Sequence, residues 1–570
     1  MGNLTKIKIV AAAGLLPPAL AAGLYLAGQL ASILLKVDSP YSWYATWWHY
    51  YRAIDLPQLA PHTGKIKLAT GIGFGLPLSI YLFLLVPLLR PKEKSPHGEA
   101  RFASKRDLAR HGMFKTTATS LVVGRMGDKL LRLSGQQFAI LAAPTRSGKG
   151  VGVVIPNLLD YQGSVVVLDI KQENFGLTSG WRASQGQGIY LFNPFAEDRR
   201  THRWNPLSYV SDDPDFRISE LMSIAAMLYP DGADWQRFWV SQARNAFMAF
   251  SLYLFESRDH QIRQKHPQEK WVTPTLGAIH RLSSGDGRGR FKTYLKKLSE
   301  TDYLSGEART AFANLLSQAD ETFASIMGAF KEPLNAFINP ILDAATSAND
   351  FLLTKVRKKK MTLYIGIQPN KLAESRLILN LLFSQLINLN TRELPQDNPE
   401  LKHQCLLLMD EFTAIGKIDI IASAASYMAG YNLRLLPIIQ SMSQLDAVYG
   451  KDVSRTLITN HALQIVYAPR EQKDANDYSE MLGYTTVRQR NRSRTHGRQG
   501  GVSFNETEQR RALMLPQELK AIGFDKEVFF YEGLPHPVLC EKVKYFESKY
   551  FTRRLLPKVK IPELELNTSP

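Results

Sequence analysis

A glycine-rich loop around Lys149 contains the residues of this sequence best suited to chemistry. The loop reads APTRSGKG over 143–150 and follows a short apolar run, 137–142, which predicts a buried strand. Backbone N–H groups of such a loop and the N-terminus of a following helix, here predicted over 151–159, surround phosphate oxygens, and the lysine reaches the β and γ oxygens. We therefore expect a phosphate site made by Pro144, Thr145, Arg146, Ser147, Gly148, Lys149, Gly150 and Val151.

The loop departs from the P-loop pattern G-x-x-x-x-G-K-[ST] at two positions. Ala143 stands where the first glycine is expected, and Gly150 replaces the hydroxyl residue that would hold magnesium. The second departure matters more because it removes a metal ligand. Taken alone, an ordinary glycine-rich turn explains the loop equally well.

An acidic pair far downstream supplies the second half of the site. Asp410 and Glu411 directly follow the apolar run 405–409, which is typical of a central parallel strand. Open α/β sheets bind ligands at the carboxyl ends of their strands, where Asp410 would hold Mg²⁺ and Glu411 would polarise the water that attacks the γ-phosphate. Such a pair often marks only the start of a helix, but together with Lys149 it predicts an ATPase whose two motifs meet at the tips of neighbouring strands.

Further polar residues follow two other predicted strands. Gln440 follows the run 435–439 and is suited to bond the γ-phosphate or the lytic water, although a polar residue that starts a loop fits as well. Three polar residues follow the strand predicted over 164–168, and they either support the residues that bind the ligand directly or form a solvated turn. They are Asp169, Lys171 and Glu173.

The size and composition of the chain place these motifs in a large globular protein. The 570 residues include 45% apolar and 21% charged residues, which excludes a disordered tail or a fibrous repeat. Only two cysteines are present, too few for a disulfide framework or a four-cysteine zinc site. The net charge of +18 favours nucleic acid, anionic lipid or an acidic partner without selecting among them. No Ser/His/Asp or HExxH pattern supports a protease or a metalloenzyme.

Two uncharged segments near the N-terminus predict a membrane anchor. The segments 9–35 and 68–89 contain 27 and 22 residues, each long enough to cross a bilayer as a helix. A signal peptide followed by a buried helix fits less well because the first run is too long. Basic residues outside both spans place the two ends in the cytosol, although Lys65 and Lys67 oppose this orientation, and use of ATP supports a cytosolic body.

The intervening sequence predicts a division into domains. Between the two nucleotide motifs, apolar residues recur at helical spacing over 218–228, 235–255, 275–282, 291–298 and 306–327. We therefore expect an anchor over 1–95, a first part of the nucleotide-binding domain over 96–206, an all-α domain over 207–349 and a second part of the nucleotide-binding domain over 350–570.

Four segments resemble the type IV secretion coupling proteins, the VirD4/TraG/TraD group. They are APTRSGKGVGVVIP over 143–156, DIKQE over 169–173, LMDEFTAIG over 408–416 and IQSMSQL over 439–445. A glycine after the P-loop lysine is itself typical of this group. The resemblance runs from about Gly98 to Phe551, and it implies an α/β fold: a RecA-like P-loop NTPase core with an inserted all-α domain and a two-helix membrane anchor.

The same resemblance implies the partners and the location of the protein. It implies a hexameric ATPase of the bacterial inner membrane that uses ATP and Mg²⁺. Such an ATPase receives single-stranded DNA with its relaxase, or an effector protein, and passes it to inner-membrane components of the secretion channel.

Arginines suggest two additional roles. Arg488, Arg490, Arg492, Arg494 and Arg498 lie in a segment without apolar periodicity, which predicts a loop or arm that either contacts phosphates or is merely solvated. Ring ATPases complete each site with an arginine from the neighbouring subunit, and Arg434 and Arg470 are the candidates because each lies near a predicted strand of the motor.

Two other functions fit the same motifs. One is an FtsK-like translocase of double-stranded DNA, which shares the motor. The other is a docking receptor that binds nucleotide without hydrolysing it, a reading favoured by Gly150.

Overall fold

The computed structural model describes residues 3–38, 40–89, 96–287, 290–494 and 502–566. The chain forms two compact units, Met1–Pro96 and His97–Pro570, each considered by itself below.

The first unit is a pair of long helices with a short one between them. Helices α1 (Asn3–Leu35) and α3 (Thr63–Leu89) flank α2 (Thr46–Arg52), and two stretches, Ala12–Leu35 and Ala60–Val86, are long and apolar enough to cross a membrane. The two helices pack closely where Gly73 meets Ala27, since a Cβ on Gly73 would lie 2.5 Å from the backbone of Ala27. Large apolar side chains such as Phe83 point outward, 78% exposed, which suits contact with lipid.

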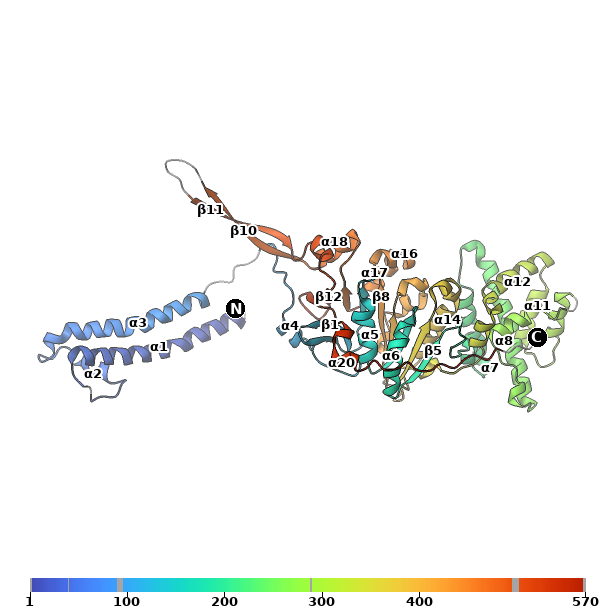
Figure 1. Ribbon diagram of the computed structural model, residues 1–570, viewed down its shortest axis with the longest axis horizontal. Coiled ribbons are helices and arrows are strands. Elements are labelled where there is room, and N and C mark those ends of the chain that lie inside the picture. Colours follow the sequence, from blue (N-terminus) through green and yellow to red (C-terminus); the bar gives the residue numbers. More distant parts are fainter. Residues whose placement is uncertain (1–2, 39, 90–95, 288–289, 495–501, 567–570) are drawn as a thin grey trace. The chain divides into compact units, whose positions relative to one another are not determined.

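The second unit is built on one mixed sheet (Figure 1). In the described part of the chain its order is β2-β1-β13-β12-β9-β3-β8-β7-β4-β6-β5, with parallel pairing from β9 to β5 and antiparallel pairing beyond β9. The strands are β1 (Leu121–Met126), β2 (Lys129–Leu133), β3 (Ala139–Ala142), β4 (Ser164–Asp169), β5 (Gly188–Phe192), β6 (Met361–Gly366), β7 (Cys405–Met409), β8 (Leu433–Ile439), β9 (Leu463–Val466), β12 (Lys526–Tyr531) and β13 (Val538–Glu541).

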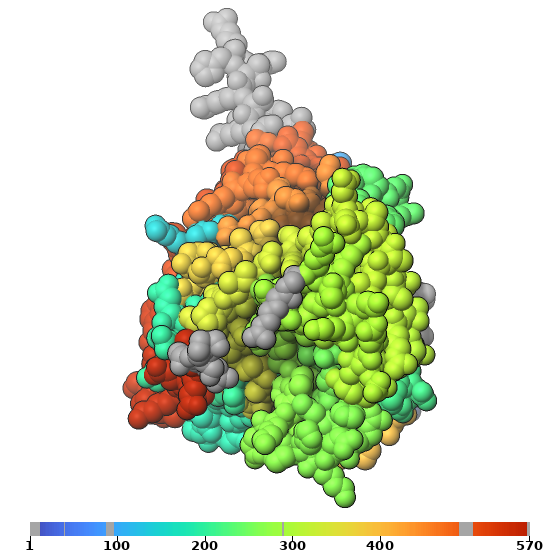
Figure 2. Space-filling view, turned by 90° about the vertical axis from the view of Figure 1, so that its right-hand side faces the viewer, coloured from blue at the N-terminus to red at the C-terminus, as the bar shows by residue number. Residues whose placement is uncertain are grey.

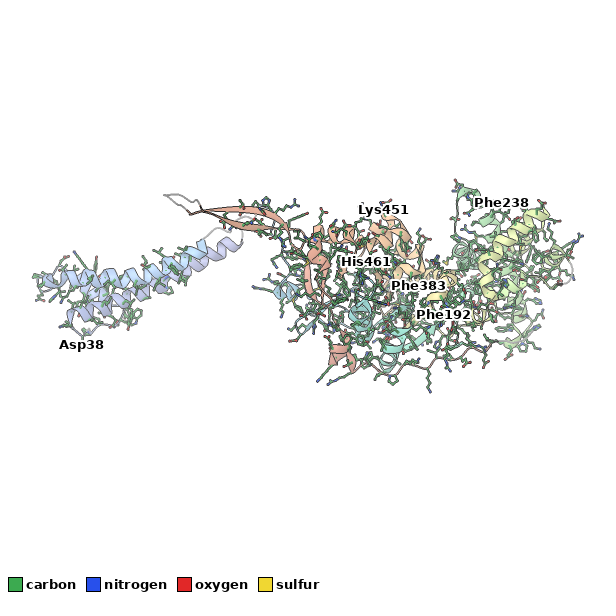
Figure 3. All side chains as sticks on the ribbon, turned by 45° about the horizontal axis from the view of Figure 1, so that its top comes forward. Asp38, Phe192, Phe238, Phe383, Lys451 and His461 are labelled. Atoms are coloured by element: carbon green, nitrogen blue, oxygen red, sulfur yellow. The ribbon has the colours of Figure 1, made fainter. Side chains whose placement is uncertain are left out.

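The central strands are continuous apolar runs because both faces of the sheet are covered. Along β7, Leu406 and Leu408 belong to the buried cluster that includes Leu158 of the helix after the P-loop. The alternate residues Leu407 and Met409 belong to the cluster that includes residues of helix α14 (Leu372–Asn390). Figure 3 shows two members of that second cluster, Phe192 and Phe383, inside the unit. Because the strands from β9 to β5 pair in parallel, their carboxyl ends lie at one edge of the sheet.

Helices cover the sheet and connect its strands. The P-loop leads into a π-helical turn, Gly150–Val154, and then α5 (Ile155–Asp160), where the sequence predicted one helix. The remaining helices of the motor are α4 (Lys105–Arg110), α6 (Glu173–Ser184), α14 (Leu372–Asn390), α15 (Asp419–Ala424), α16 (Met442–Tyr449), α17 (Lys451–Thr459), α18 (Gln472–Met481), α19 (Pro516–Lys520) and α20 (Lys549–Thr552).

A helical insert connects β5 to β6 and forms much of the face seen in Figure 2, where it is green to yellow-green. Its helices are α7 (Pro214–Leu228), α8 (Arg237–Arg263), α9 (Leu276–Leu282), α10 (Phe291–Ser299), α11 (Gly306–Leu316), α12 (Asp320–Leu334) and α13 (Pro340–Ala345). The single helix predicted over 306–327 is wrong: the chain leaves helical geometry at Ser317–Ala319 and restarts with Asp320 and Glu321, acidic residues that favour a helix N-terminus. The extent of the all-α domain, 207–349, stays a proposal.

Arg488, Arg490, Arg492 and Arg494 lie in a strand, where the sequence predicted a loop or arm. Strand β10 (Tyr484–Arg494) pairs antiparallel with β11 (Val502–Ala512) in a separate two-stranded sheet. Cross-strand pairs stabilise such a hairpin without an apolar face, and Arg488 Nε lies 3.0 Å from Glu508 Oε1 on the partner strand. Arg498 lies outside the described residues.

A buried ion cluster fastens the C-terminal segment to the P-loop helix. Asp160, the last residue of α5, pairs with Arg132 and accepts hydrogen bonds from Tyr550 and from Arg554 Nη1, the latter at 3.0 Å. Although burial opposes it, the hydrogen bond from Arg132 lowers the pKa of Asp160.

Asp160→Asn is expected to destabilise the protein by about 3 kcal/mol, because it leaves buried guanidinium groups without a counter-charge. Guanidinium-induced unfolding of the detergent-solubilised chain measures this. The control is Glu541→Gln, which removes the exposed pair with Arg125 and should cost less than about 1 kcal/mol. Equal effects of the two changes would contradict the argument.

Candidate nucleotide site

The P-loop, residues 143–150, is a tight turn at the carboxyl end of β3. Its backbone reverses through Arg146 and Gly148, whose φ angles are 61° and 87°. The Gly152 N–H donates to the Gly148 carbonyl over 2.8 Å and starts the helix. Such a turn followed by a helix N-terminus presents N–H groups on one side, as anion binding requires.

The structure explains how the loop tolerates its two unusual residues. Ala143 is buried and hydrogen-bonds through its N–H to the Ile439 carbonyl at 2.9 Å, and the described residues with positive φ do not include it, so alanine fits there without strain. Gly150 has open space around the position of a Cβ. A hydroxyl residue would fit at 150, so space does not require glycine there.

The acidic pair meets the P-loop lysine at the carboxyl end of the sheet. Lys149 Nζ lies 3.4 Å from Asp410 Oδ1 and also forms an ion pair with Glu411. The two motifs do not lie on neighbouring strands as the sequence predicted, because β8 lies between β3 and β7. Lys149 nevertheless reaches both carboxylates. Glu411 takes a left-handed backbone angle, φ 57°, at the tip of β7.

The two carboxyl groups differ in their electrostatics. Burial raises the pKa of Asp410, although nearby Lys149 opposes the rise. Burial also disfavours ionisation of Glu411, but hydrogen bonds from Lys149 and Gln440 outweigh it and lower the pKa of Glu411. Glu411 is therefore ionised at neutral pH and can accept a proton.

Gln440 connects the two motifs. Its Nε2 donates to Glu411 Oε2 over 3.0 Å, and its Oε1 accepts from the Thr145 hydroxyl over 3.1 Å. A side chain that contacts both the P-loop and the carboxylate can transmit a change at one to the other. Thr145 supplies this contact, which sequence reasoning did not identify.

Of the polar residues predicted at the end of β4, Asp169 has a structural role. Asp169 is buried and accepts hydrogen bonds from the backbone N–H groups of Asn174 and Phe175, at 3.3 and 2.7 Å, so it fixes the start of α6. Burial raises the pKa of Asp169 to about 7. Lys171 and Glu173 are exposed.

Arg434 cannot act as an arginine finger, which corrects the expectation from sequence. It is fully buried near the amino end of β8, at the opposite edge of the sheet from the P-loop. Its guanidinium donates to the carbonyls of Gln137, Thr119 and Leu133 at 2.8, 2.8 and 3.2 Å. Its role is therefore structural, because it holds together the chain segments that contain these three carbonyls. Arg470, in contrast, is exposed and donates to the Thr145 carbonyl of its own P-loop over 2.9 Å.

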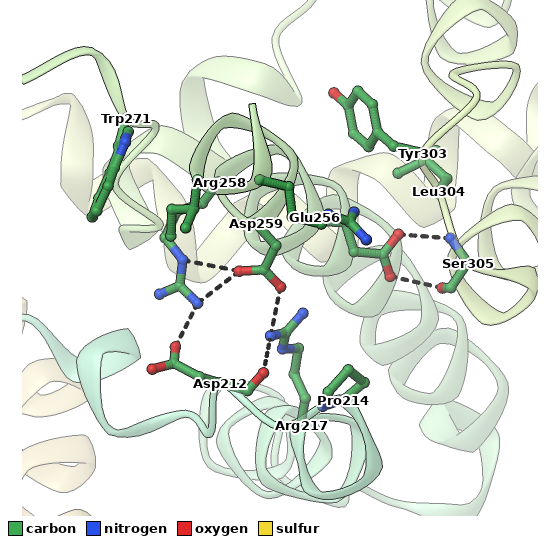
Figure 4. A pocket seen from close by; sticks show the side chains of 12 residues that line it. Asp212, Pro214, Arg217, Glu256, Arg258, Asp259, Trp271, Tyr303, Leu304 and Ser305 are labelled. Atoms are coloured by element: carbon green, nitrogen blue, oxygen red, sulfur yellow. Dashed lines mark hydrogen bonds and ion pairs between the residues drawn. The ribbon is translucent and has the colours of Figure 1, made fainter. Parts of the chain in front are cut away.

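Two cavities of the second unit differ in size, and the larger one does not lie beside the P-loop. A cavity of about 760 Å³ lies in the helical insert, where Arg217 and Arg258 both pair with Asp259, and Arg258 also pairs with Asp212 (Figure 4). The guanidinium groups of Arg217 and Arg258 are thus already paired with carboxylates. The cavity beside the P-loop is smaller, about 210 Å³, and Thr145, Gln440 and Arg470 are among its lining residues.

The residues at the P-loop fit a magnesium-bound triphosphate. Ser147 Oγ is buried without a hydrogen-bond partner, as expected for an atom that contacts a ligand, whereas Asp410 Oδ1 is paired with Lys149. A carboxylate oxygen suits Mg²⁺, which keeps several waters and takes only one or two protein ligands beside substrate phosphates.

The parallel strands, the P-loop and the acidic pair together define a P-loop NTPase with a RecA-like core. The chain belongs to the family described as "Type IV secretory system Conjugative DNA transfer", which matches residues 96–566. This confirms the resemblance to type IV secretion coupling proteins.

Relatives and solved structures agree with this assignment. The chain is 29% identical to Protein VirD4 of Rhizobium radiobacter, over 84% of this chain and 68% of the relative, and 27% identical to the conjugal transfer protein TraG of Escherichia coli, over 80% and 78%. It shares its fold with the bacterial conjugative coupling protein TrwB, at 17% identity and a TM-score of 0.56 over 80% of this chain and 95% of that one. A structure of TrwB with ADPNP matches 84% of this chain and 99% of that one, at 16% identity and a TM-score of 0.55. A structure of TrwB with ADP and Mg²⁺ matches 84% of this chain and 98% of that one, at 16% identity and a TM-score of 0.54.

Proposed function

We propose that this protein is a membrane-anchored ATPase that drives single-stranded DNA with its attached relaxase, or an effector protein, toward a type IV secretion channel. The observation that carries the proposal is the meeting of Lys149 with Asp410 and Glu411 at the tip of the sheet. Family membership supports the transfer role, and TrwB bound to ADP and Mg²⁺ supports the choice of nucleotide and metal.

Each residue of the site has a proposed part in hydrolysis. Lys149 holds the β and γ oxygens, which requires it to exchange its ion pairs for phosphate contacts. Asp410 holds Mg²⁺, which when bound neutralises charge on the phosphates. Glu411 accepts a proton from the attacking water, and Gln440 orients Glu411 through the hydrogen bond between them. The P-loop residues Pro144 to Val151 cradle the phosphates.

The assembly and location follow the family resemblance. We propose a homo-hexamer in the bacterial inner membrane, with α1 and α3 as its two spans and the second unit in the cytosol. Arg470 contacts the P-loop of its own chain and therefore acts within its own site. The hairpin of β10 and β11 is the proposed contact for single-stranded cargo, because the exposed Arg488 and Arg510 lie on it.

The test is ATP hydrolysis by the full-length chain in lipid nanodiscs, with and without single-stranded DNA. Turnover is expected to rise several-fold with single-stranded DNA, and the rise should weaken with salt because phosphate contacts release counterions. Stronger stimulation by duplex DNA would instead support the double-strand translocase. Tight ATP binding without turnover under every cargo condition would support the docking receptor, which the missing hydroxyl at Gly150 favours.

A further inference from the structure

Three buried polar side chains lie under the P-loop, on the strands that extend the sheet beyond β3. Tyr467 follows β9, Glu527 is in β12 and Lys542 follows β13. Their exposed fractions are 1%, 1% and 5%. A lysine is rarely buried to this degree without a specific partner, so its contacts define its role.

Lys542 points at the middle of the P-loop. Its Nζ donates to the Ser147 carbonyl over 3.1 Å and lies 3.7 Å from the centre of the Tyr467 ring. Burial lowers the pKa of Lys542 to about 8, while the nearby Glu527 favours its charged form. The ammonium is therefore still largely protonated at neutral pH and can donate.

Tyr467 holds the loop on either side of this contact. Its N–H donates to the carbonyl of Ala142, immediately before the loop, over 3.0 Å. Its hydroxyl lies against the helix after the loop, since a Cβ on Gly152 would be only 2.3 Å from that oxygen. The P-loop is therefore supported at its start, middle and end by Lys542 and Tyr467.

The contact at Ser147 fixes the direction of a peptide group. In a trans peptide the carbonyl and the following N–H point in opposite directions. A carbonyl drawn toward buried Lys542 therefore turns the Gly148 N–H to the other side of the loop. The positive φ of Gly148, 87°, is the backbone angle that accompanies this orientation, and glycine adopts it without strain.

We propose that Lys542 is a positioning residue for nucleotide binding, which holds the Ser147–Gly148 peptide with its carbonyl turned inward and its N–H available to a phosphate oxygen. This inference rests on the proposed function. Lys542 touches neither the nucleotide nor the reacting atoms and acts only through the backbone of the loop.

The test compares three variants of the full-length chain by their affinity for a fluorescent ATP analogue and by the KM and kcat of hydrolysis. Lys542→Met should weaken binding and raise KM about tenfold, since it removes a hydrogen bond from a charged donor. Lys542→Arg, which keeps a charged donor, should restore most of the affinity. Lys544→Met is the matched control, because Lys544 pairs with Asp525 and Glu547 at the surface.

The outcomes separate this inference from the proposed function. Wild-type protein without ATP affinity would overturn the proposed function itself. Normal affinity in Lys542→Met, or an equal loss in the methionine and arginine variants, would overturn only the role of Lys542. If Lys542→Met does not fold, Lys542→Gln is measured instead, and it should bind ATP several-fold more weakly than the wild type; unchanged affinity would again overturn the role.

Discussion

Replacing Glu411 with glutamine is expected to reduce ATP turnover by about 10² to 10⁴-fold, the usual contribution of a general base. Glutamine keeps the size of the side chain and can still hydrogen-bond Gln440, but it cannot accept the proton of the attacking water. Binding of ATP should be at least as tight as in the wild type, because the ion pair that Glu411 makes with Lys149 no longer competes with phosphate. Steady-state hydrolysis and equilibrium binding measured on the same preparation test both halves.

Glu471→Gln is the matched control for this change. Glu471 lines the cavity beside the P-loop but accepts a hydrogen bond from Ser443 rather than contacting Lys149. It should keep at least half of the wild-type turnover. Substantial turnover in Glu411→Gln would show that another group activates the water, and the proposed mechanism would then be wrong.

The parts of the fold predicted from sequence are those that local apolar pattern determines. Strands β4, β7 and β8 contain the uninterrupted apolar runs 165–168, 405–409 and 435–439, so their positions were predicted to within two residues. The antiparallel strands β1, β2, β12 and β13 were missed. They alternate or mix polar residues, and one of them includes the buried Glu527, which only tertiary partners stabilise.

Some residues of the candidate site could likewise be predicted from the sequence, and others could not. Lys149, Asp410 and Glu411 could be found because each belongs to a motif in a defined position relative to a strand. Lys542 could not, since it lies 393 positions beyond Lys149 in the chain (542 against 149) and no local pattern marks it. Arg434 was assigned wrongly on proximity to a strand alone: it precedes the run 435–439 and so lies at the amino end of the strand, and its complete burial has no signal in the sequence.

Replacing Lys149 with alanine is expected to abolish detectable turnover and, unlike Glu411→Gln, to weaken ATP binding about 10 to 100-fold. The change removes the charged donor for the β and γ oxygens. It also leaves Asp410 and Glu411 without their cation, so their negative charge faces the triphosphate. Titration of a fluorescent ATP analogue and a hydrolysis assay measure the two effects.

Lys171→Ala provides the control for charge alone. Lys171 is exposed and lowers the pKa of Glu411 from a distance, so its loss removes a nearby positive charge without removing a P-loop donor. We expect this variant to bind ATP within about threefold of the wild type, since exposed charges are screened by salt. If the two lysine variants lost affinity equally, the general positive field would bind the nucleotide and the P-loop lysine would have no special role. If Lys149→Ala kept full turnover, the site would lie elsewhere, and the meeting of lysine and carboxylates would be only a structural ion pair.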